Sequence, residues 1–445
     1  MNTLLSHSLD VPVDKLAEPE SRPRPFPAGA SLEGKDPAYA LEHAFSAIDE
    51  HEANVRAWTH IVSRDELPES GVLNGPLAGV PFGVKDVIMA AGMPTRCGSP
   101  ASDDRAAAFN GASVDLLARA GAIPLGKTVT AEYAFRDPGP TRNPHNLAHT
   151  PGGSSSGSAA AVAAGMVPLA LSTQTGGSII RPAAYCGVPG FKPSFGLLSR
   201  DGMQLTSDSL DTIGWHASDM DWMIRAAKVL LPTLGKTDAM DSLAGARVAV
   251  VDYAPEASLE DEGREALDRA IQILQRAGAR CMPVDARSKL DELVRAHTAI
   301  MKYEFARNLN PVVRTRGGLL TPSLLKNVEE GWNTPADHYL AMCAFQHEMR
   351  TQWHALSGGA DFILTPPAAG PAPAGHEFTG APAFNKCWTV LGWPCLHVPV
   401  HRNSAGLPTG VQLVGPWKRD FNVLSYGAQL ERLLRPHSPQ SNKLK

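Results

Sequence analysis

The sequence lacks a strong charge of either sign. It holds 41 basic and 45 acidic residues, which give a formal net charge of −4 at neutral pH. Proteins that bind nucleic acid usually carry a marked basic excess. We therefore expect no nucleic-acid partner.

Cysteine is scarce, and no two cysteines form a C-x-x-C pair. The six are Cys97, Cys186, Cys281, Cys343, Cys387 and Cys395. This scattered spacing is not that of a disulfide-stabilised scaffold. We expect a reducing, cytoplasmic location.

Long hydrophobic runs are also missing. The longest stretch of small apolar residues, 159–171, has 13 residues and is interrupted by Gly165 and Pro168, whereas a membrane-spanning helix needs about 20. Residues 1–10 have neither the basic nor the apolar part of a signal peptide. Because no H-E-x-x-H motif or compact His/Cys cluster is present, we expect no metal and no cofactor. These absences predict a soluble protein without a membrane partner, and we expect a monomer or homodimer.

Glycine and proline, in contrast, are abundant, with 40 and 37 residues. Five of the prolines lie within residues 1–30, which we expect to form an extended arm. Beyond the arm, helical and strand-like hydrophobic patterns alternate. Helices are predicted from Pro37 with Asp36 as its cap, at 112–120 and at 258–277 with Ser258 as its first residue, and strands at 58–62, 167–173 and 247–252. This alternation is typical of an α/β protein, and we expect one domain over residues 31–435 with a tail at 436–445.

One motif suggests a nucleotide-binding ATPase. Residues 121–128 match G-x-x-x-x-G-K-[ST], and residues 248–252 match an apolar strand that ends in Asp. A phosphate loop follows a strand and begins a helix, but here Gly121 ends a helix and Pro124 removes an N–H donor. We also expect residues 128–130 to continue as a strand. A P-loop ATPase is therefore the weaker alternative.

A second motif resembles the nucleophile elbow of α/β-hydrolases. Residues 153–157 match G-x-S-x-G with Ser155 at the centre. The elbow needs a strand directly before it, whereas residues 143–151 hold two prolines and predict a loop. We expect instead that residues 150–158 form a nest of backbone N–H groups before a small-residue helix at 159–165.

Two further segments suggest acyl transfer. In Thr175-Gly-Gly-Ser178 the glycines leave successive N–H groups uncovered, as an oxyanion hole requires. Upstream, Lys85 lies within the apolar strand pattern of residues 79–89. Burial lowers the pKa of a lysine, which can then act as a neutral base. An ion pair between Lys85 and Asp86, or a solvent-facing amine, is the structural alternative.

Together these segments resemble the amidase signature hydrolases. The matching stretches are 79–86, 141–144, 151–165, 175–178, 190–196 and 406–415. The resemblance implies that Ser178 is the nucleophile, that Ser154 follows a cis peptide bond and relays protons, and that Lys85 is the base. It also implies an oxyanion hole from Thr175, Gly176, Gly177 and Ser178, with support from Ser155, Asp86 and Gln174. The implied fold is a single large α/β/α domain with a twisted mixed sheet covered by helices.

Three positions depart from the family pattern. Ser156 replaces a glycine, Gln174 replaces a common aspartate, and Arg181 lies one place later than the usual arginine. The change at Gln174 predicts a rearranged hydrogen-bond network in which its side chain is paired. These departures argue against the A subunit of glutamyl-tRNA amidotransferase and against the membrane-anchored fatty-acid amide group.

We therefore expect a hydrolase that cleaves the C–N bonds of small or aryl amides through an acyl-enzyme. Esters and carbamates (urethanes) are further candidate substrates, and an amidotransferase A-type subunit that acts with a partner is the alternative. Substrate choice is expected to lie in residues 201–222, 300–345 and 376–390. The candidate wall residues are Met203, Phe305, Phe384 and Trp388.

Overall fold

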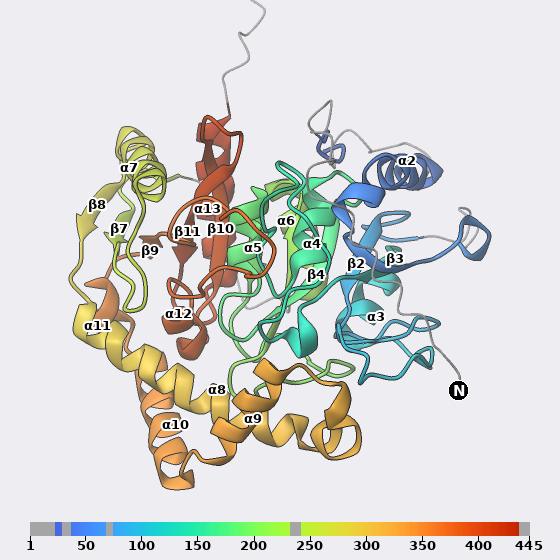
Figure 1. Cartoon of the computed structure of the whole chain (residues 1–445). Coiled ribbons are helices and arrows are strands. Elements are labelled where there is room, and N and C mark those ends of the chain that lie inside the picture. Colours follow the sequence, from blue (N-terminus) through green and yellow to red (C-terminus); the bar gives the residue numbers. More distant parts are fainter. Residues whose placement is uncertain (1–22, 29–36, 68–73, 232–241, 436–445) are drawn as a thin grey trace, which may run out of the picture.

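A mixed β-sheet runs through the centre of the molecule in the computed structural model (Figure 1), which describes residues 23–28, 37–67, 74–231 and 242–435. Eleven strands of these residues form the sheet. In spatial order they are β1 (Trp58–Ile61), β3 (Ile123–Thr128), β2 (Pro81–Lys85), β4 (Leu169–Gln174), β6 (Thr212–Ala217), β5 (Gly190–Lys192), β10 (Cys395–Arg402), β11 (Pro408–Val414), β9 (Phe362–Thr365), β7 (Arg247–Val250) and β8 (Arg280–Pro283).

The parallel part of the sheet brings two strand ends together. β2 lies between β3 and β4 and is parallel to both, with Val84 paired to Lys127 on one side and to Leu171 on the other. β2 and β4 therefore end at the same edge of the sheet, at Lys85 and Gln174. Such carboxyl edges are where α/β sheets place their functional side chains.

Helices cover both faces of the sheet, because successive residues of a strand point to opposite sides. Leu169 and Leu171 of β4 pack into one hydrophobic cluster, and Ala170 packs into another. The first cluster includes α3 (Ala112–Arg119), α6 (Met220–Leu230), α7 (Asp261–Arg276) and α13 (Asp420–Leu434), and the second includes α2 (Pro37–Val55), α4 (Ser156–Ala163) and α5 (Ile180–Cys186). The α/β/α fold around a mixed sheet, predicted from the sequence, is confirmed.

A further group of helices lies along the lower side of the molecule in Figure 1, where the long α8 packs against α9, α10 and α12. These elements are α8 (Arg287–Arg316), α9 (Pro322–Trp332), α10 (Ala336–Arg350), α11 (Trp353–Ser357) and α12 (Lys386–Leu391), and single 3₁₀ turns occupy Arg64–Glu66, Glu132–Ala134 and Gly317–Leu319. A third hydrophobic cluster joins α8 and α12 to the sheet through Leu293, Ile300 and Trp388. Residues of α8 therefore pack directly against the central sheet.

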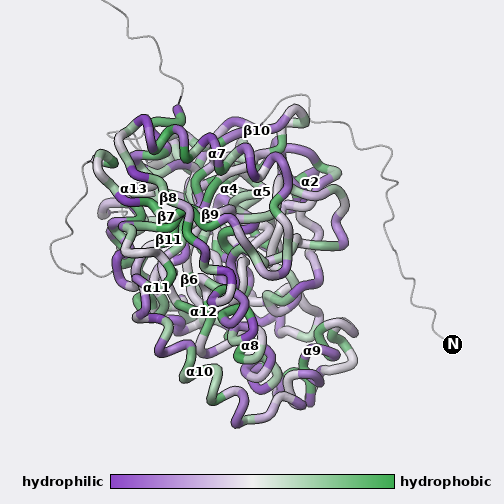
Figure 2. The backbone as a smooth tube through the Cα atoms, turned by 90° about the vertical axis from the view of Figure 1, so that its left-hand side faces the viewer, coloured by the Kyte–Doolittle hydropathy of each residue, from purple (hydrophilic) through white to green (hydrophobic). Residues whose placement is uncertain are grey.

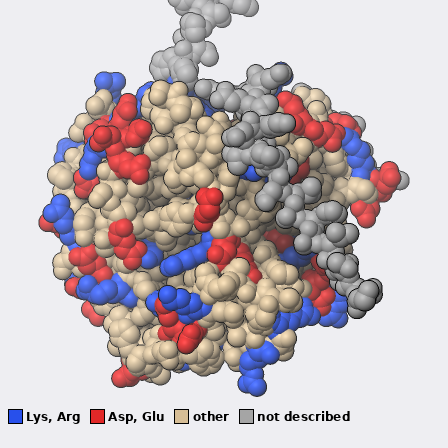
Figure 3. Space-filling view, viewed as in Figure 1, with Lys and Arg blue, Asp and Glu red and all other residues tan. Residues whose placement is uncertain are grey.

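Hydropathy and charge follow this layered arrangement. Hydrophobic stretches of the chain lie along the strands in the middle of the molecule, and mixed or hydrophilic stretches lie outside (Figure 2). On the face drawn in Figure 3, basic and acidic side chains are interspersed among uncharged ones. The described residues of that face form no large patch of one sign.

Some predicted element bounds are wrong by a few residues. The helix predicted from Ser258 begins at Asp261, because the Glu260 N–H donates to Ala369 O and fixes the chain just before the helix. β3 ends at Thr128 instead of continuing to residue 130, since the Val129 N–H turns to Ala57 O. The small-residue helix begins at Ser156, three residues early.

The nucleotide-binding motif does not form a phosphate loop. Gly126, Lys127 and Thr128 belong to β3, and β7, which carries the second half of the motif, lies near the opposite edge of the sheet. The two halves of the motif therefore cannot meet at one nucleotide.

The predicted arm is described only at residues 23–28. There Phe26 is buried against α2, and Trp222 Nε1 donates to Pro27 O at 3.0 Å. The rest of the arm, the Asp36 cap and the tail at 436–445 lie outside the described residues.

Candidate active site

Lys85, at the carboxyl end of β2, is fully buried. Its Nζ is hydrogen-bonded to Ser154 Oγ and to Thr173 Oγ1, both at 2.8 Å. Burial lowers the pKa of Lys85 to about 7, and the nearby Arg181 charge lowers it too, whereas Asp211 acts in the opposite direction. About half of the amine is therefore neutral near pH 7, as a general base requires.

Ser154 lies in the loop that leads into α4. The Gly153–Ser154 peptide bond is cis, as the family resemblance predicted. A Cβ at Gly152 would lie 2.9 Å from Pro182 Cα, so only glycine allows this loop to pack against α5. The relay serine is thus held against the helix that follows Ser178.

Ser178 lies in the turn between β4 and α5 and keeps 7% of its surface exposed, while Ser154 is fully buried. The turn leaves backbone donors free: within the described part of the chain, the N–H groups of Gly176, Gly177 and Ser178 make no hydrogen bond. A turn with three unused N–H groups can stabilise a negatively charged oxygen next to the nucleophile.

Two side chains from other elements donate hydrogen bonds to carbonyl groups of the same turn. His297 of α8 donates from Nε2 to Thr175 O at 2.7 Å, and Thr389 of α12 donates to Gly176 O at 2.7 Å. Burial lowers the pKa of His297 to about 3, so its ring is neutral. The sequence alone did not indicate either residue, because neither lies in a recognisable motif and both come from distant helices, α8 and α12.

Gln174 ends β4 beside this turn, and its side chain is fully engaged. Its Oε1 accepts the N–H groups of Ile179 (2.8 Å) and Ile180 (3.0 Å), and its Nε2 donates to Thr389 Oγ1 at 3.0 Å. The amide therefore joins the start of α5 to α12 as a neutral group. The expected pairing of this side chain is present.

Comparison with known protein families decides the relationship. The family model described as Amidase matches residues 63–424. The chain belongs to the amidase family. One curated relative of this amidase-family chain is the A subunit of glutamyl-tRNA(Gln) amidotransferase from Treponema pallidum subsp. pallidum. The two are 32% identical, with 90% of this chain and 91% of the relative covered.

Solved structures agree with the amidase family assignment. The inhibitor-bound structure of a vestigial protein complex that reveals the origins of an s-triazine catabolic enzyme has a TM-score of 0.81 and 26% identity, covering 92% of this chain and 98% of that one. The peptide amidase from Stenotrophomonas maltophilia has a TM-score of 0.76 and 27% identity, covering 92% and 96%.

The other predicted residues of this amidase-family chain lie near the site in different ways. Ser155 is fully buried and donates to Thr173 O at 3.2 Å, so it is not the exposed serine of an elbow. Asp86 does not pair with Lys85: its carboxylate lies 3.0 Å from Lys127 Nζ, and both side chains are fully buried.

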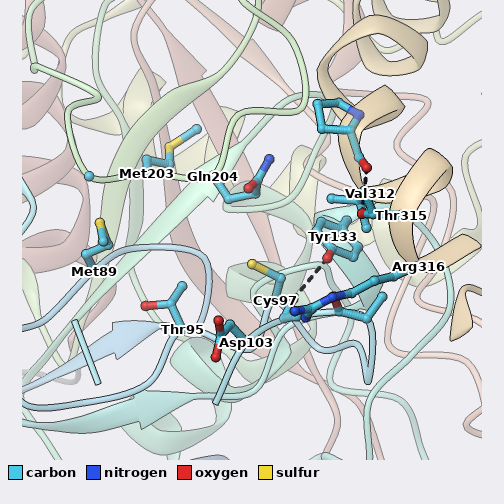
Figure 4. A pocket seen from close by; sticks show the side chains of 14 residues that line it. Met89, Thr95, Cys97, Asp103, Tyr133, Met203, Gln204, Val312, Thr315 and Arg316 are labelled. Carbon is cyan, nitrogen blue, oxygen red and sulfur yellow. Dashed lines mark hydrogen bonds between the residues drawn. The ribbon is translucent and has the colours of Figure 1, made fainter. Parts of the chain in front are cut away.

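A cavity of about 540 Å³ opens beside the loops that follow β2 (Figure 4). Met203 lines it, together with Cys97 and Tyr133, and residues 311–316 of α8 close one side. The Cys97 N–H donates to Asp86 O, which ties this wall to the segment that carries Lys85. Two of the three segments predicted to determine substrate choice therefore meet here. Phe305, Phe384 and Trp388 are buried in hydrophobic clusters.

The described residues contain no group of three or more His, Cys, Asp or Glu residues placed to hold a metal ion. No helix among them is long and apolar enough to cross a membrane.

Proposed function

We propose that this chain cleaves the C–N bond of carboxamides through an acyl-enzyme on Ser178. The observation that carries the proposal is the 2.8 Å hydrogen bond between Lys85 Nζ and Ser154 Oγ in a fully buried site, with the pKa of Lys85 lowered to about 7. A neutral amine bonded to a serine next to a glycine-rich turn is suited to moving a proton away from a nucleophile.

The first half of the reaction forms the acyl-enzyme. Ser178 Oγ attacks the amide carbon while its proton passes to Ser154 and the Ser154 proton passes to neutral Lys85. The N–H groups of the turn at 175–178 stabilise the resulting oxyanion. As the C–N bond breaks, Ser154 protonates the leaving nitrogen and recovers a proton from Lys85.

The second half repeats this relay with water in place of the amine. Water attacks the acyl carbon, its proton travels through Ser154 to Lys85, and the tetrahedral intermediate expels Ser178 with that proton returned. The products are a carboxylic acid and an amine or ammonia. Small and aryl amides are the proposed substrates, and esters and carbamates offer the same acyl carbon.

Competition by hydroxylamine tests the shared acyl-enzyme. An amide and an ester with the same acyl group should give the same ratio of hydroxamate to acid, because both pass through one intermediate. Ratios that depend on the leaving group, or ammonia release without hydroxamate, would contradict it.

A second candidate is an amidotransferase A-type subunit, and the relative from Treponema pallidum carries that name at 32% identity over nine tenths of both chains. This similarity favours the second candidate over a free-standing hydrolase, although Gln174 and Arg181 depart from the family pattern. Both candidates share the same amide cleavage. They differ in whether a partner is needed.

Purification from the native host at low salt distinguishes the two candidates. An amidotransferase component should copurify with a stoichiometric partner and release ammonia from glutamine only in that complex. A free hydrolase should turn over an aryl amide at the same rate whether or not other proteins are present.

A further inference from the structure

The cavity of about 540 Å³ in Figure 4 is built in part from the segment that follows the proposed base. Met89 and Cys97 line it, and both belong to the loops that leave β2 after Lys85. The Cys97 N–H donates to Asp86 O at 2.8 Å. This hydrogen bond ties one wall of the cavity to the residue next to Lys85.

A second wall of the cavity leads to the oxyanion turn. Gln204 lines the cavity, and two residues further along the chain Thr206 Oγ1 lies 2.9 Å from Thr175 Oγ1. Segments that reach both the base and the turn therefore form the cavity. Its volume lies within the range of about 300–1,000 Å³ that is typical of small-molecule sites.

The proposed relay determines on which side of the nucleophile the amine part of a substrate leaves. A general acid has to lie within hydrogen-bond reach of the atom that it protonates. Ser154 takes this role, and its Oγ is hydrogen-bonded to Lys85 Nζ at 2.8 Å. The leaving nitrogen therefore lies on the side of Ser154 and Lys85, and the cavity wall at Met89 and Cys97 follows Lys85 on that side.

Apolar and polarizable side chains form the walls on which a planar ring can pack. Figure 4 shows Met89 and Met203 on one side of the cavity and Tyr133 and Val312 on the other. The Tyr133 ring is held in place, because its hydroxyl lies 3.0 Å from Ser102 Oγ. Thioethers and tyrosine rings both make favourable contacts with aromatic groups.

The backbone of this cavity is held in conformations that residues with a Cβ rarely adopt. Cys97 has a φ of 53° and Tyr133 a φ of 43°, and the Tyr133 N–H donates to Cys97 O at 2.8 Å. Such conformations cost free energy, and they persist mainly at ligand sites and catalytic sites, where the surrounding structure enforces them. Two walls are therefore fixed in shape before a ligand enters.

Arg316, the last residue of α8, supplies a positive charge to this cavity. Its side chain extends from α8 along the lower side of the cavity (Figure 4), and Nη1 donates to Ala101 O at 3.0 Å. Among the described residues no carboxylate forms an ion pair with it. The nearby Asp103 is paired with Arg105 at 2.6 Å. The guanidinium of Arg316 is therefore available to an anionic ligand.

We propose that this cavity binds the leaving group of the substrate, and that the preferred leaving group is an aromatic amine that carries a carboxylate, such as an aminobenzoate. This inference rests on the proposed function. The ring packs between the two methionines and Tyr133, and the carboxylate pairs with Arg316, whose planar guanidinium matches a carboxylate. As the C–N bond breaks, the anilide nitrogen takes the Ser154 proton and departs as a neutral amino group.

The kinetic test compares 4-acetamidobenzoate with 4-acetamidobenzamide, which has the same shape and no charge. In the wild type we expect kcat/KM to be about fivefold higher for the acid, the upper range for a solvent-accessible charge pair. Leaving-group chemistry alone favours the neutral substrate, because a carboxamide withdraws more electron density from the ring. Arg316→Met should bring the two values of kcat/KM to within about twofold of each other.

The matched control is Arg314→Met. Arg314 is an exposed arginine of the same helix that does not line the cavity. Its removal should leave the ratio of the two rates as it is in the wild type. A wild type without preference for the acid would overturn the proposal, as would a preference that survives in Arg316→Met.

A bulky side chain in the cavity tests which half of the substrate lies there. Met203→Trp should lower the ratio of anilide to primary-amide turnover at least about tenfold for one acyl group, because ammonia as a leaving group needs no cavity. If Met203→Trp instead changes the preference among acyl chains of primary amides, the cavity holds the acyl part and the proposal fails.

A binding measurement keeps this inference separate from the proposed function. In the methionine methyl NMR spectrum of the full chain, 4-aminobenzoate should shift the signals of Met89 and Met203, which line the cavity, but not that of Met166, which packs on the other face of the sheet. Arg316→Met should weaken this binding at least threefold.

The outcomes of the NMR measurement separate the two claims. If both signals shift and no amide is cleaved, the proposed function fails and the assignment of the cavity stands. If amides are cleaved while both signals stay in place at saturating 4-aminobenzoate, the assignment of the cavity fails alone.

Discussion

The lowered pKa of Lys85 makes a quantitative prediction about activity and pH. With a pKa of about 7 instead of 10.5, the neutral amine is about half of the population at pH 7 and roughly 1% at pH 5. If Lys85 is the base, kcat/KM should fall about tenfold per pH unit below 7, and about 50-fold between pH 7 and pH 5. The assay is kcat/KM for a neutral aryl amide from pH 5 to pH 9 at constant ionic strength.

Removal of the Asp211 charge, which opposes the lowering of the Lys85 pKa, tests the direction of this pH dependence. Asp211 raises the pKa of Lys85, whereas Arg181 lowers it. Asp211→Asn should therefore move the acidic limb to lower pH, and Asn can still accept from Thr206 and Ser207, which now donate to the carboxylate. A flat profile down to pH 5, or a limb that moves to higher pH in Asp211→Asn, would refute a lysine base.

The same shift affects stability. The folded state holds Lys85 at a pKa of about 7, below its usual 10.5, so between these values the unfolded chain binds more protons and stability rises with pH. Below pH 7 the folded state bears the full free-energy cost of burying the charged Lys85 amine, which approaches about 5 kcal/mol. Lys85→Met should abolish activity and remove this rise of stability with pH. Urea denaturation at pH 6 and pH 10 measures the change in stability. An unchanged slope would contradict the shift.

Three further variants test the surroundings of the turn. Gln174→Leu should lower the free energy of unfolding by about 3 kcal/mol in urea titrations, because two backbone N–H groups lose their buried acceptor; a change below about 1 kcal/mol would argue against this network. His297→Phe should lower kcat about tenfold with KM nearly unchanged, since it releases the Thr175 carbonyl, while His297→Gln should recover part of the loss. Lys127→Met should cost about 3–5 kcal/mol by leaving Asp86 buried without its partner, and a stability equal to the wild type would show the pair to be dispensable.

Local sequence was sufficient to find the residues that occupy motifs. Ser154 and Ser178 lie in glycine-rich segments because backbone N–H groups must be uncovered there, and glycine is the residue that allows it. Lys85 was recognisable because a lysine within an apolar strand pattern is unusual. The strand ends that bring Lys85 and Gln174 to one edge follow from the parallel pairing of β2 with β4.

The partners of those residues could not be predicted, because they come from distant parts of the chain. His297 and Thr389 reach the turn from α8 and α12, more than 100 and 200 residues further along. The alternative ion pair between Lys85 and Asp86 fails for a geometric reason. Consecutive residues at a strand end point to opposite sides, so Asp86 faces Lys127 instead. Lys127 was conspicuous in the sequence only as part of a nucleotide-binding motif that the structure does not form.

The most direct test of the Ser178 assignment is covalent labelling. A fluorophosphonate should modify the wild type once per chain, and peptide mass spectrometry should place the adduct on Ser178. Labelling should be lost in Lys85→Met and retained in Lys192→Met, which removes a buried lysine bonded to Trp393 O. An adduct on Ser155, or full labelling of Ser178 without Lys85, would contradict the Lys85–Ser154–Ser178 relay.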